Sequence, residues 1–126
     1  MKYYYHHVHL ICSDLPQTEG FFTRILGAEV VERKKFGAAD GITVDLNGSF
    51  FCIRKAVDTD EIVSDSSQKR FGYDHVALQV EDVDAAYTEL TAKGVTFTIP
   101  PKNGTSARIA FFKGPDNITF ELYHPF

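Results

Sequence analysis

The sequence has no long run of hydrophobic residues. Its longest apolar stretches, such as residues 109–112, are only a few residues long and cannot span a bilayer. The first residues, 1–7, lack the apolar core of a signal peptide. Cysteine is scarce as well: only Cys12 and Cys52 are present, which excludes a disulfide-built miniprotein. These absences predict a cytoplasmic protein with reduced thiols.

A strong charge of either sign is also missing. The 126 residues include 13 lysines and arginines and 17 aspartates and glutamates, so the formal net charge is −4. A mildly acidic chain without a basic stripe is a poor candidate for binding nucleic acid or an anionic membrane. The hydrophobic and charged shares, 44% and 24%, exclude intrinsic disorder and predict one globular domain over residues 1–126.

The chain does contain an internal duplication. Residues 7–15 resemble residues 75–83 at a constant offset, with His, Val, Leu and Asp recurring in register. Each copy then enters a helical stretch that an aspartate caps. The predicted helices end at Gly27 in the first copy and at Gly94 in the second.

Strand-like segments follow the helix in both copies. Residues 42–46 alternate with period two and return through an Asn-Gly turn into residues 49–54. Residues 107–112 and 118–123 form a similar pair. Residues 100–106, with two prolines and a glycine, are predicted to form a mobile loop.

Each half is therefore predicted as a strand, a helix and three further strands. The expected fold class is α+β, built from two βαβββ modules. Module one covers residues 1–57 and module two covers residues 72–126. The polar residues 58–71 are predicted to link them.

Alternation along the strands gathers polar side chains on one face. The apolar residues at alternate positions must face the helices, so the residues between them take the opposite face. The polar residues on that opposite face are His7, His9, His75, Gln79, Glu121 and Tyr123. Two imidazoles and one carboxylate, from His7, His75 and Glu121, are a ligand set for a borderline divalent metal. Three protein ligands leave room for water and substrate, as a catalytic site requires.

These motifs resemble those of a known family. The pattern His-Val-x-Leu followed by an acidic helix cap occurs twice, and residues 114–122 read Gly-Pro-Asp-Asn-Ile-Thr-Phe-Glu-Leu. Over nearly its whole length the chain is similar to the vicinal oxygen chelate superfamily. Its members include glyoxalase I, methylmalonyl-CoA epimerase, extradiol dioxygenases, fosfomycin-resistance thiol transferases and metal-free bleomycin-resistance proteins. The resemblance implies a glyoxalase-like fold, in which paired modules with curled mixed sheets form a cavity.

The resemblance also implies where ligands lie. Carried over to this sequence, the family positions are His7, His75 and Glu121, with Cys52 at the fourth place. Glyoxalase I would have a glutamate at that fourth place and the epimerase a glutamine. A His, His, Glu set is similar to that of extradiol dioxygenases and fosfomycin transferases. The implied cofactor is a divalent metal ion: Fe, Mn, Ni, Co or Zn.

Further residues are assigned to catalysis or substrate binding. His9 is a candidate base or hydrogen-bond donor, and Tyr123 is a candidate donor to a bound oxygen. The candidate substrate-binding residues are Phe50, Cys52, Arg54, Gln79, Arg108 and Phe112. Arginines bind carboxylates or phosphates, and the two phenylalanines, predicted on the cavity face, indicate a partly apolar substrate. The alternatives are cavity lining for His9, packing for Tyr123 and a small buried apolar group for Cys52.

Two classes of function stay open. In the first, a metal chelates two neighbouring oxygens of a small substrate, with glyoxalase-like lyase or isomerase chemistry favoured over dioxygenase or thiol-transfer chemistry. In the second, the chain is a metal-free protein that binds a small molecule without turnover. We expect a homodimer. One chain carries both modules and can form the site alone, or the subunits exchange modules, which would place His7 and His75 on different chains.

Overall fold

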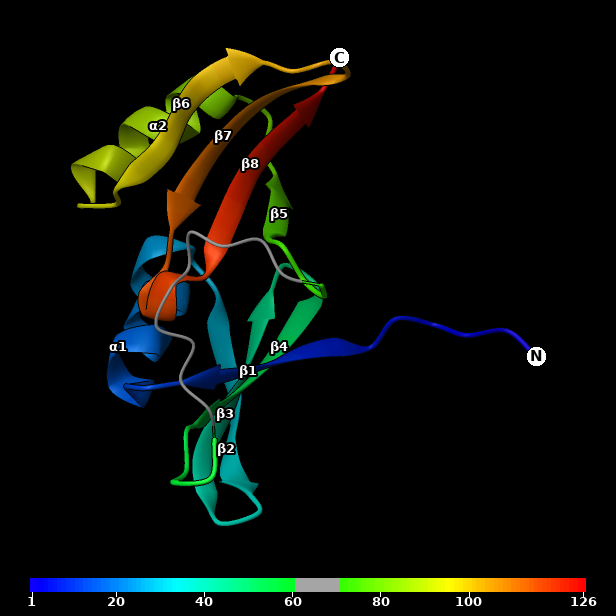
Figure 1. The fold of residues 1–126 in the computed structure, drawn as a ribbon, viewed down its shortest axis with the longest axis vertical. Helices are drawn as coiled ribbons and strands as arrows, with labels where there is room; N and C mark the ends of the chain where they lie inside the picture. Colours follow the sequence, from blue (N-terminus) through cyan, green and yellow to red (C-terminus); the bar gives the residue numbers. More distant parts are fainter. Residues whose placement is uncertain (61–70) are drawn as a thin grey trace. The chain divides into compact units, whose positions relative to one another are not determined.

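The computed structural model describes residues 1–60 and 71–126, so most of the predicted linker, residues 58–71, lies outside the described residues. The chain divides into two compact units, Met1–Ile62 and Val63–Phe126. Each unit has a strand, a helix and three further strands in that order, which confirms the predicted pair of βαβββ modules (Figure 1).

The first unit is a four-stranded mixed sheet with one helical segment. Its elements are β1 (His7–Cys12), α1 (Leu15–Gly20), the π-helical turn η1 (Phe21–Ile25), β2 (Glu29–Phe36), β3 (Ala39–Leu46) and β4 (Ser49–Lys55). The strand order is β1-β4-β3-β2, in which β1 and β4 are parallel and the other pairs are antiparallel. The first strand therefore lies at the edge of the sheet, beside the last.

The second unit repeats this topology. Its elements are β5 (Val76–Gln79), α2 (Val83–Ala92), β6 (Phe97–Asn103), β7 (Ala107–Lys113), the short 3-10 turn η2 (Pro115–Asn117) and β8 (Thr119–Pro125). The strand order is β5-β8-β7-β6, and β5 and β8 are the parallel pair. In both units the duplicated His-Val motif thus begins the edge strand that pairs with the unit's last strand.

The helices begin and end where the sequence predicts. The side chains of Asp14 and Asp82 each accept a hydrogen bond of 2.9 Å from the backbone N–H three residues later, which satisfies a donor that the first helical turn leaves unpaired. After each helix a glycine, Gly27 or Gly94, takes a left-handed conformation with φ of 77° and 89°. Residues other than glycine rarely adopt that backbone conformation. The two glycines therefore allow the chain to end the helix and turn back toward the sheet.

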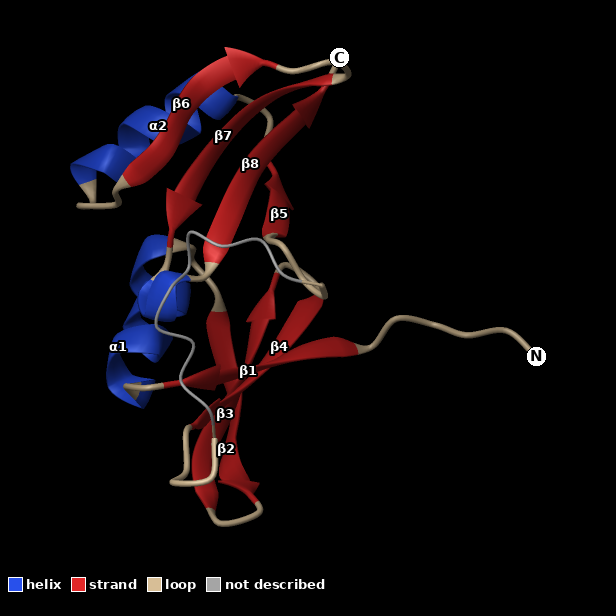
Figure 2. Ribbon diagram, in the orientation of Figure 1, coloured by secondary structure: helices blue, strands red, loops and turns tan. Residues whose placement is uncertain are grey.

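Each unit buries its core between the helix and one face of its own sheet. In unit 1, Phe22 of η1 packs against Phe51 of β4 with ring centroids 5.1 Å apart. In unit 2, α2 contacts β6, β7 and β8 (Figure 2), and Phe112 stacks on Phe120 at 5.4 Å. The opposite face of each sheet is the one on which alternation predicts the polar residues. No helix among residues 1–60 and 71–126 is long and apolar enough to cross a membrane.

The prediction of a mobile loop at residues 100–106 is wrong for most of that segment. Residues Phe97–Asn103 form strand β6, and only residues 104–106 connect it to β7. Proline has no N–H for a sheet ladder, but β6 is the edge strand, and its pairing with β7 is irregular between Ile99 and Lys102. The two prolines, Pro100 and Pro101, occupy that irregularity.

Candidate metal centre and substrate face

A histidine and a glutamate meet on the open face of the second sheet. Glu121 of β8 pairs with Ala77 of β5, and His75 lies two positions before Ala77, so alternation puts both side chains on one face. The two atoms His75 Nε2 and Glu121 Oε2 are 2.9 Å apart. The Glu121 side chain is 11% exposed and that of His75 is 30% exposed, so the pair is partly shielded from water. The structure thus brings together two of the three predicted ligands.

A second carboxylate contacts the same imidazole. His75 Nδ1 lies 2.8 Å from Asp74 Oδ1, so both ring nitrogens have a carboxylate oxygen as neighbour. A neutral imidazole has a single N–H and can donate to only one of them. The other contact therefore needs a second proton or a metal cation between the nitrogen and the oxygen.

The separation of the two donor atoms suits a shared divalent cation. Ligands at about 2.1 Å from a metal and at right angles to one another are about 3 Å apart. The 2.9 Å between His75 Nε2 and Glu121 Oε2 matches that spacing. Imidazole nitrogen and carboxylate oxygen are also a donor pair that Mn, Fe, Co, Ni and Zn accept. These two residues consequently fit a metal ion in both chemistry and spacing.

The ring of Phe111 packs beside this pair. Phe111 pairs with Glu121 across β7 and β8, and its ring centroid is 5.3 Å from that of His75. The predicted orientation of Phe112 is wrong, because Phe112 pairs with Phe120 and is fully buried on the helix side. Residues 109–112 are all apolar, so the sequence gives no alternation from which to assign the faces of this strand.

Two other predicted residues lie on the face of Glu121. Tyr123 of β8 pairs with Gln79 of β5, two positions further along both strands. Arg108 is not brought to this face. It pairs with His124, on the side of Leu122, and its guanidinium forms an ion pair with Asp84 of α2.

The open face of the first sheet carries the other predicted side chains. Phe51 and Ile53 of β4 point into the core, so the residues between and beside them take the opposite face. Across the parallel β1–β4 pair, the register on that face matches His7 with Phe50, His9 with Cys52, and Ile11 with Arg54. The His7 and His9 rings are 6.4 Å apart.

His9 has an aromatic neighbour that the sequence did not indicate. Its ring packs edge-on against Phe36 of β2 at 4.6 Å between centroids. Phe36 lies over Gly41, where an added Cβ would be 2.2 Å from the phenylalanine ring and 2.7 Å from the Ile53 carbonyl oxygen. Partial burial, and then the charges of Arg54 and His7, lower the pKa of His9 below its ordinary value. The lowered pKa favours the neutral ring, which has a lone pair that can accept a proton.

Cys52 is buried beside His9 in the sheet. Its sulfur lies 3.7 Å from the hydroxyl of Thr43, the residue opposite it on β3. No disulfide joins it to Cys12, which is also buried. These contacts are those of a small buried thiol. The role of Cys52 as a fourth metal ligand stays a prediction.

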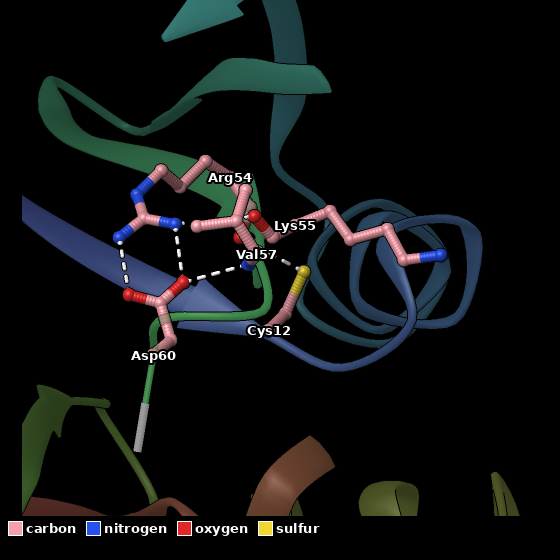
Figure 3. A network of polar contacts seen from close by, with 5 residues as sticks. All are labelled: Cys12, Arg54, Lys55, Val57 and Asp60. Atoms are coloured by element: carbon pink, nitrogen blue, oxygen red, sulfur yellow. Dashed lines mark hydrogen bonds and ion pairs between the residues drawn. The ribbon is translucent and has the colours of Figure 1, made fainter. Parts of the chain in front are cut away.

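Arg54 is held by a carboxylate of its own unit (Figure 3). Its two terminal nitrogens donate to the two oxygens of Asp60, over 2.8 and 2.9 Å. The backbone N–H of Val57 donates to the same carboxylate over 2.7 Å. These hydrogen bonds, that of Arg54 first, lower the pKa of Asp60 to about 2. The guanidinium of Arg54, which is predicted to bind substrate, therefore has its charge balanced by Asp60 in this conformation.

The Arg54–Asp60 pair predicts an acid-dependent loss of stability. The pKa of Asp60 is lowered on folding, so the unfolded chain binds more protons between about pH 4 and 2 and the stabilisation is lost as the pH falls through that window. We expect Asp60→Asn to destabilise the protein at pH 6 and the difference from wild type to close toward pH 2. Urea unfolding followed by circular dichroism across this range measures it. Asp58→Asn, an exposed residue of the same turn, is the control, and a difference that does not vary with pH would contradict the prediction.

The three predicted ligands are divided between the two units. His75 and Glu121 belong to the second, and His7 belongs to the first. Within either unit, no three His, Cys, Asp or Glu side chains among the described residues form a complete metal-binding group. The sequence did not predict four contacts in this region: His6 with His7, Phe36 with His9, and both Asp74 and Phe111 with His75. Asp74 could have been found as the acidic neighbour of His75, whereas Phe36 depends on a strand register that periodicity does not fix.

Comparison with known proteins gives consistent matches along the chain. A family model described as Glyoxalase/Bleomycin resistance protein/Dioxygenase superfamily matches residues 4–122. The uncharacterized protein YwkD of Bacillus subtilis is 32% identical over 122 residues, which cover 94% of this chain and 94% of YwkD.

Solved structures agree with this match. The crystal structure of SMU.1112c has a TM-score of 0.83 and 26% identity, over 97% of this chain and 98% of that chain. A mutant of the fosfomycin resistance protein FosX from Listeria monocytogenes was solved with Mn(II) and 1S,2S-dihydroxypropylphosphonic acid. It has a TM-score of 0.75 and 26% identity, over 100% of this chain and 95% of that chain.

Proposed function

Because the chain belongs to the Glyoxalase/Bleomycin resistance protein/Dioxygenase superfamily, as its motifs predict, we propose that it is a metal-dependent enzyme of the vicinal oxygen chelate type. Its substrate is a small molecule with two neighbouring oxygen atoms, and its chemistry is that of a glyoxalase-like lyase or isomerase. The observation that carries this proposal is the 2.9 Å pairing of His75 Nε2 with Glu121 Oε2.

His7 is proposed as the third ligand. It occupies in β1 the position that His75 occupies before β5, because the two residues match in the duplicated motif. It also lies on the open face of its sheet, as His75 and Glu121 do on theirs. Two imidazoles and one carboxylate leave coordination positions for substrate oxygens.

A bound divalent cation would supply Lewis-acid stabilisation of negative charge that develops on the substrate oxygens. The chain's own residues would bind and orient the substrate and move its proton. We propose that His9 accepts a proton from a substrate carbon or hydroxyl; its position on the face of His7, 6.4 Å from it between ring centroids, supports this role. Tyr123 and Gln79, which are paired on β8 and β5, are proposed to donate hydrogen bonds to substrate oxygens.

The other residues on these faces support a substrate that is partly apolar and carries little charge. Phe50 of β4 and Phe111 of β7 supply apolar contacts to a carbon chain or ring. The two arginines predicted to bind an anion have carboxylate partners, Asp60 for Arg54 and Asp84 for Arg108. That pairing favours a neutral or weakly charged substrate over a phosphonate.

A resistance-type enzyme is the second candidate function. The FosX mutant was solved with Mn(II) and a phosphonic acid that carries two neighbouring hydroxyl groups. Its similarity to this chain covers 100% of this chain. A fosfomycin-directed activity would require Arg54 to leave Asp60 and bind the phosphonate. Retained turnover of fosfomycin in an Arg54→Ala variant would contradict that route.

Metal binding by the purified full chain tests the proposal. We expect one Co(II) per chain in an anaerobic titration monitored by visible absorption. His7→Ala should weaken Co(II) binding by more than about 100-fold, because loss of an outer-shell partner alone costs 10- to 100-fold. His9→Ala, on the same face, should retain the metal and lose turnover of whichever hemithioacetal, diketone or catechol the wild type converts.

The metal-free alternative predicts a different result. A chain that binds no Co(II), Mn(II), Fe(II), Ni(II) or Zn(II), but binds a small molecule equally well in wild type and His7→Ala, would be a sequestering protein rather than an enzyme. That outcome would contradict the proposed function.

A further inference from the structure

The residue before each candidate histidine ligand contacts the same ring nitrogen. His75 Nδ1 lies 2.8 Å from Asp74 Oδ1, and His7 Nδ1 lies 2.8 Å from His6 Nδ1. Asp74 and His6 occupy equivalent positions of the duplicated motif, one residue before the matched histidines. The two units thus place a hydrogen-bonding side chain at the same atom, although one is a carboxylate and the other an imidazole.

The position of the ring proton decides which nitrogen can bind a metal. A neutral imidazole carries one proton, and the nitrogen without it has the lone pair. A carboxylate is only an acceptor, so a neutral His75 can donate to Asp74 from Nδ1 or to Glu121 from Nε2, but not to both. When the proton is on Nδ1, the lone pair is on Nε2, the atom 2.9 Å from Glu121 Oε2.

Glu121 competes for the same proton. Without Asp74, the proton of a neutral His75 would move to Nε2 and be donated to the Glu121 carboxylate, which is buried. A metal arriving at the pair would then have to expel that proton and break the hydrogen bond. Asp74, 2.8 Å from Nδ1, is the acceptor that can hold the proton away from Nε2.

We propose that Asp74, and His6 when it accepts through its own Nδ1, are positioning residues that keep the proton of His75 and of His7 on Nδ1, so that each histidine offers Nε2 to the metal. The proposal rests on the proposed function, because it concerns the same ligands. Neither residue touches the substrate or the metal. Their action passes through the ligand rings, as outer-shell carboxylates and carbonyls act on histidines in other metal sites.

The two positioning residues should differ in strength. Hydrogen bonds to a charged acceptor are about twice as strong as those to a neutral one, and Asp74 is charged whereas a neutral His6 accepts through its own Nδ1 lone pair. Loss of Asp74 should therefore cost more than loss of His6. Exchange of His6 for aspartate would give the first unit the arrangement of the second.

Nitrogen-15 correlation spectra of the histidine rings in the metal-free chain test the proposal directly. At about pH 8.5, two units above the ordinary histidine pKa, the spectrum reports which ring nitrogen carries the proton. We expect Nδ1–H for His75 in wild type and Nε2–H in Asp74→Ala. Asp74→Asn, whose amide oxygen can still accept, should keep Nδ1–H and serves as the conservative rescue.

Co(II) affinity of the same variants is the second readout. Asp74→Ala should weaken binding by about 10- to 100-fold, His6→Ala should weaken it less, and His6→Asp should bind at least as tightly as wild type. The thermal midpoint of the metal-free chain should not change, because Asp74 and His6 are exposed. A lower midpoint with an unaltered tautomer would indicate a structural role and overturn the proposal.

The two proposals fail in different ways. If wild type binds Co(II) and Asp74→Ala alters neither the His75 tautomer nor the affinity, the positioning role is overturned and the metal centre stands. If wild type binds no metal, the metal centre is contradicted, and an unaltered tautomer in Asp74→Ala would overturn the positioning role as well.

Discussion

Replacing Glu121 with glutamine should lower Co(II) affinity by more than about 100-fold, because it removes the only anionic donor of the proposed set, whereas outer-shell losses cost 10- to 100-fold. The amide keeps the size of the side chain but loses the charge that attracts the cation. Its oxygen is a weaker ligand for Mn, Fe, Co, Ni or Zn than a carboxylate. Isothermal titration and the visible spectrum of the Co(II)-loaded chain measure the change.

A matched substitution in the same unit controls for the loss of one negative charge. Glu89 is exposed on α2 and pairs with Lys93 on its own helix, so Glu89→Gln should leave Co(II) affinity unchanged. If Glu121→Gln binds Co(II) as tightly as Glu89→Gln does, Glu121 is not a ligand.

The Glu121→Gln and His7→Ala chains also separate two arrangements of the proposed site. If one chain supplies all three ligands, an equimolar mixture of the two variants has no complete site and binds Co(II) as weakly as each variant does alone. If a homodimer exchanges ligands between subunits, mixed dimers contain one complete site and recover part of the binding. Size-exclusion chromatography of the mixture establishes whether dimers are present.

Truncation of Phe112 to alanine should destabilise the protein by about 3–5 kcal/mol, the range for deletion of a buried aromatic ring. Phe112 is 0% exposed, stacks on Phe120, and contacts Phe97 at 5.2 Å between centroids. The space that it fills lies between the sheet and α2, whose Tyr87 packs on Phe97, so the cavity cannot close without moving the helix. Urea unfolding of the full chain followed by circular dichroism gives the free-energy difference.

Phe111 provides the comparison within the same strand. It is partly exposed and packs against His75 on the other face, so Phe111→Ala should cost much less stability. It should instead shift the histidine ring resonances of His75. Equal destabilisation by the two substitutions would contradict the assignment of the two faces.

The fold and the placement of His75 and Glu121 on one face could be predicted because both depend on local pattern. The duplicated motif fixes the order of elements, and alternation with period two puts His75 and Glu121 on one face. A parallel pairing of the first and last strands of the module then brings the two residues together. Each of these steps follows from the repeat and the alternation, without knowledge of how individual side chains pack.

The remaining details depend on packing that a pattern does not encode. Both faces of β7 carry apolar residues, so the register with β8 alone distinguishes Phe111 from Phe112. The ion pairs of Arg54 and Arg108 depend on where a turn and a helix place Asp60 and Asp84. Residues 100–103 have the composition of a loop, and only their place at a sheet edge allows them to be a strand.

Every strand pairing among the described residues joins strands of the same unit. Each half of the gene therefore encodes a complete hydrogen-bonded ladder, as expected if fusion of two ancestral copies produced the chain. Recombination between relatives at the junction would transfer His7 as one block and His75 with Glu121 as another. Chimeras cut there should keep both ladders, so new combinations of metal donors are accessible to evolution, or to a library, in a single crossover.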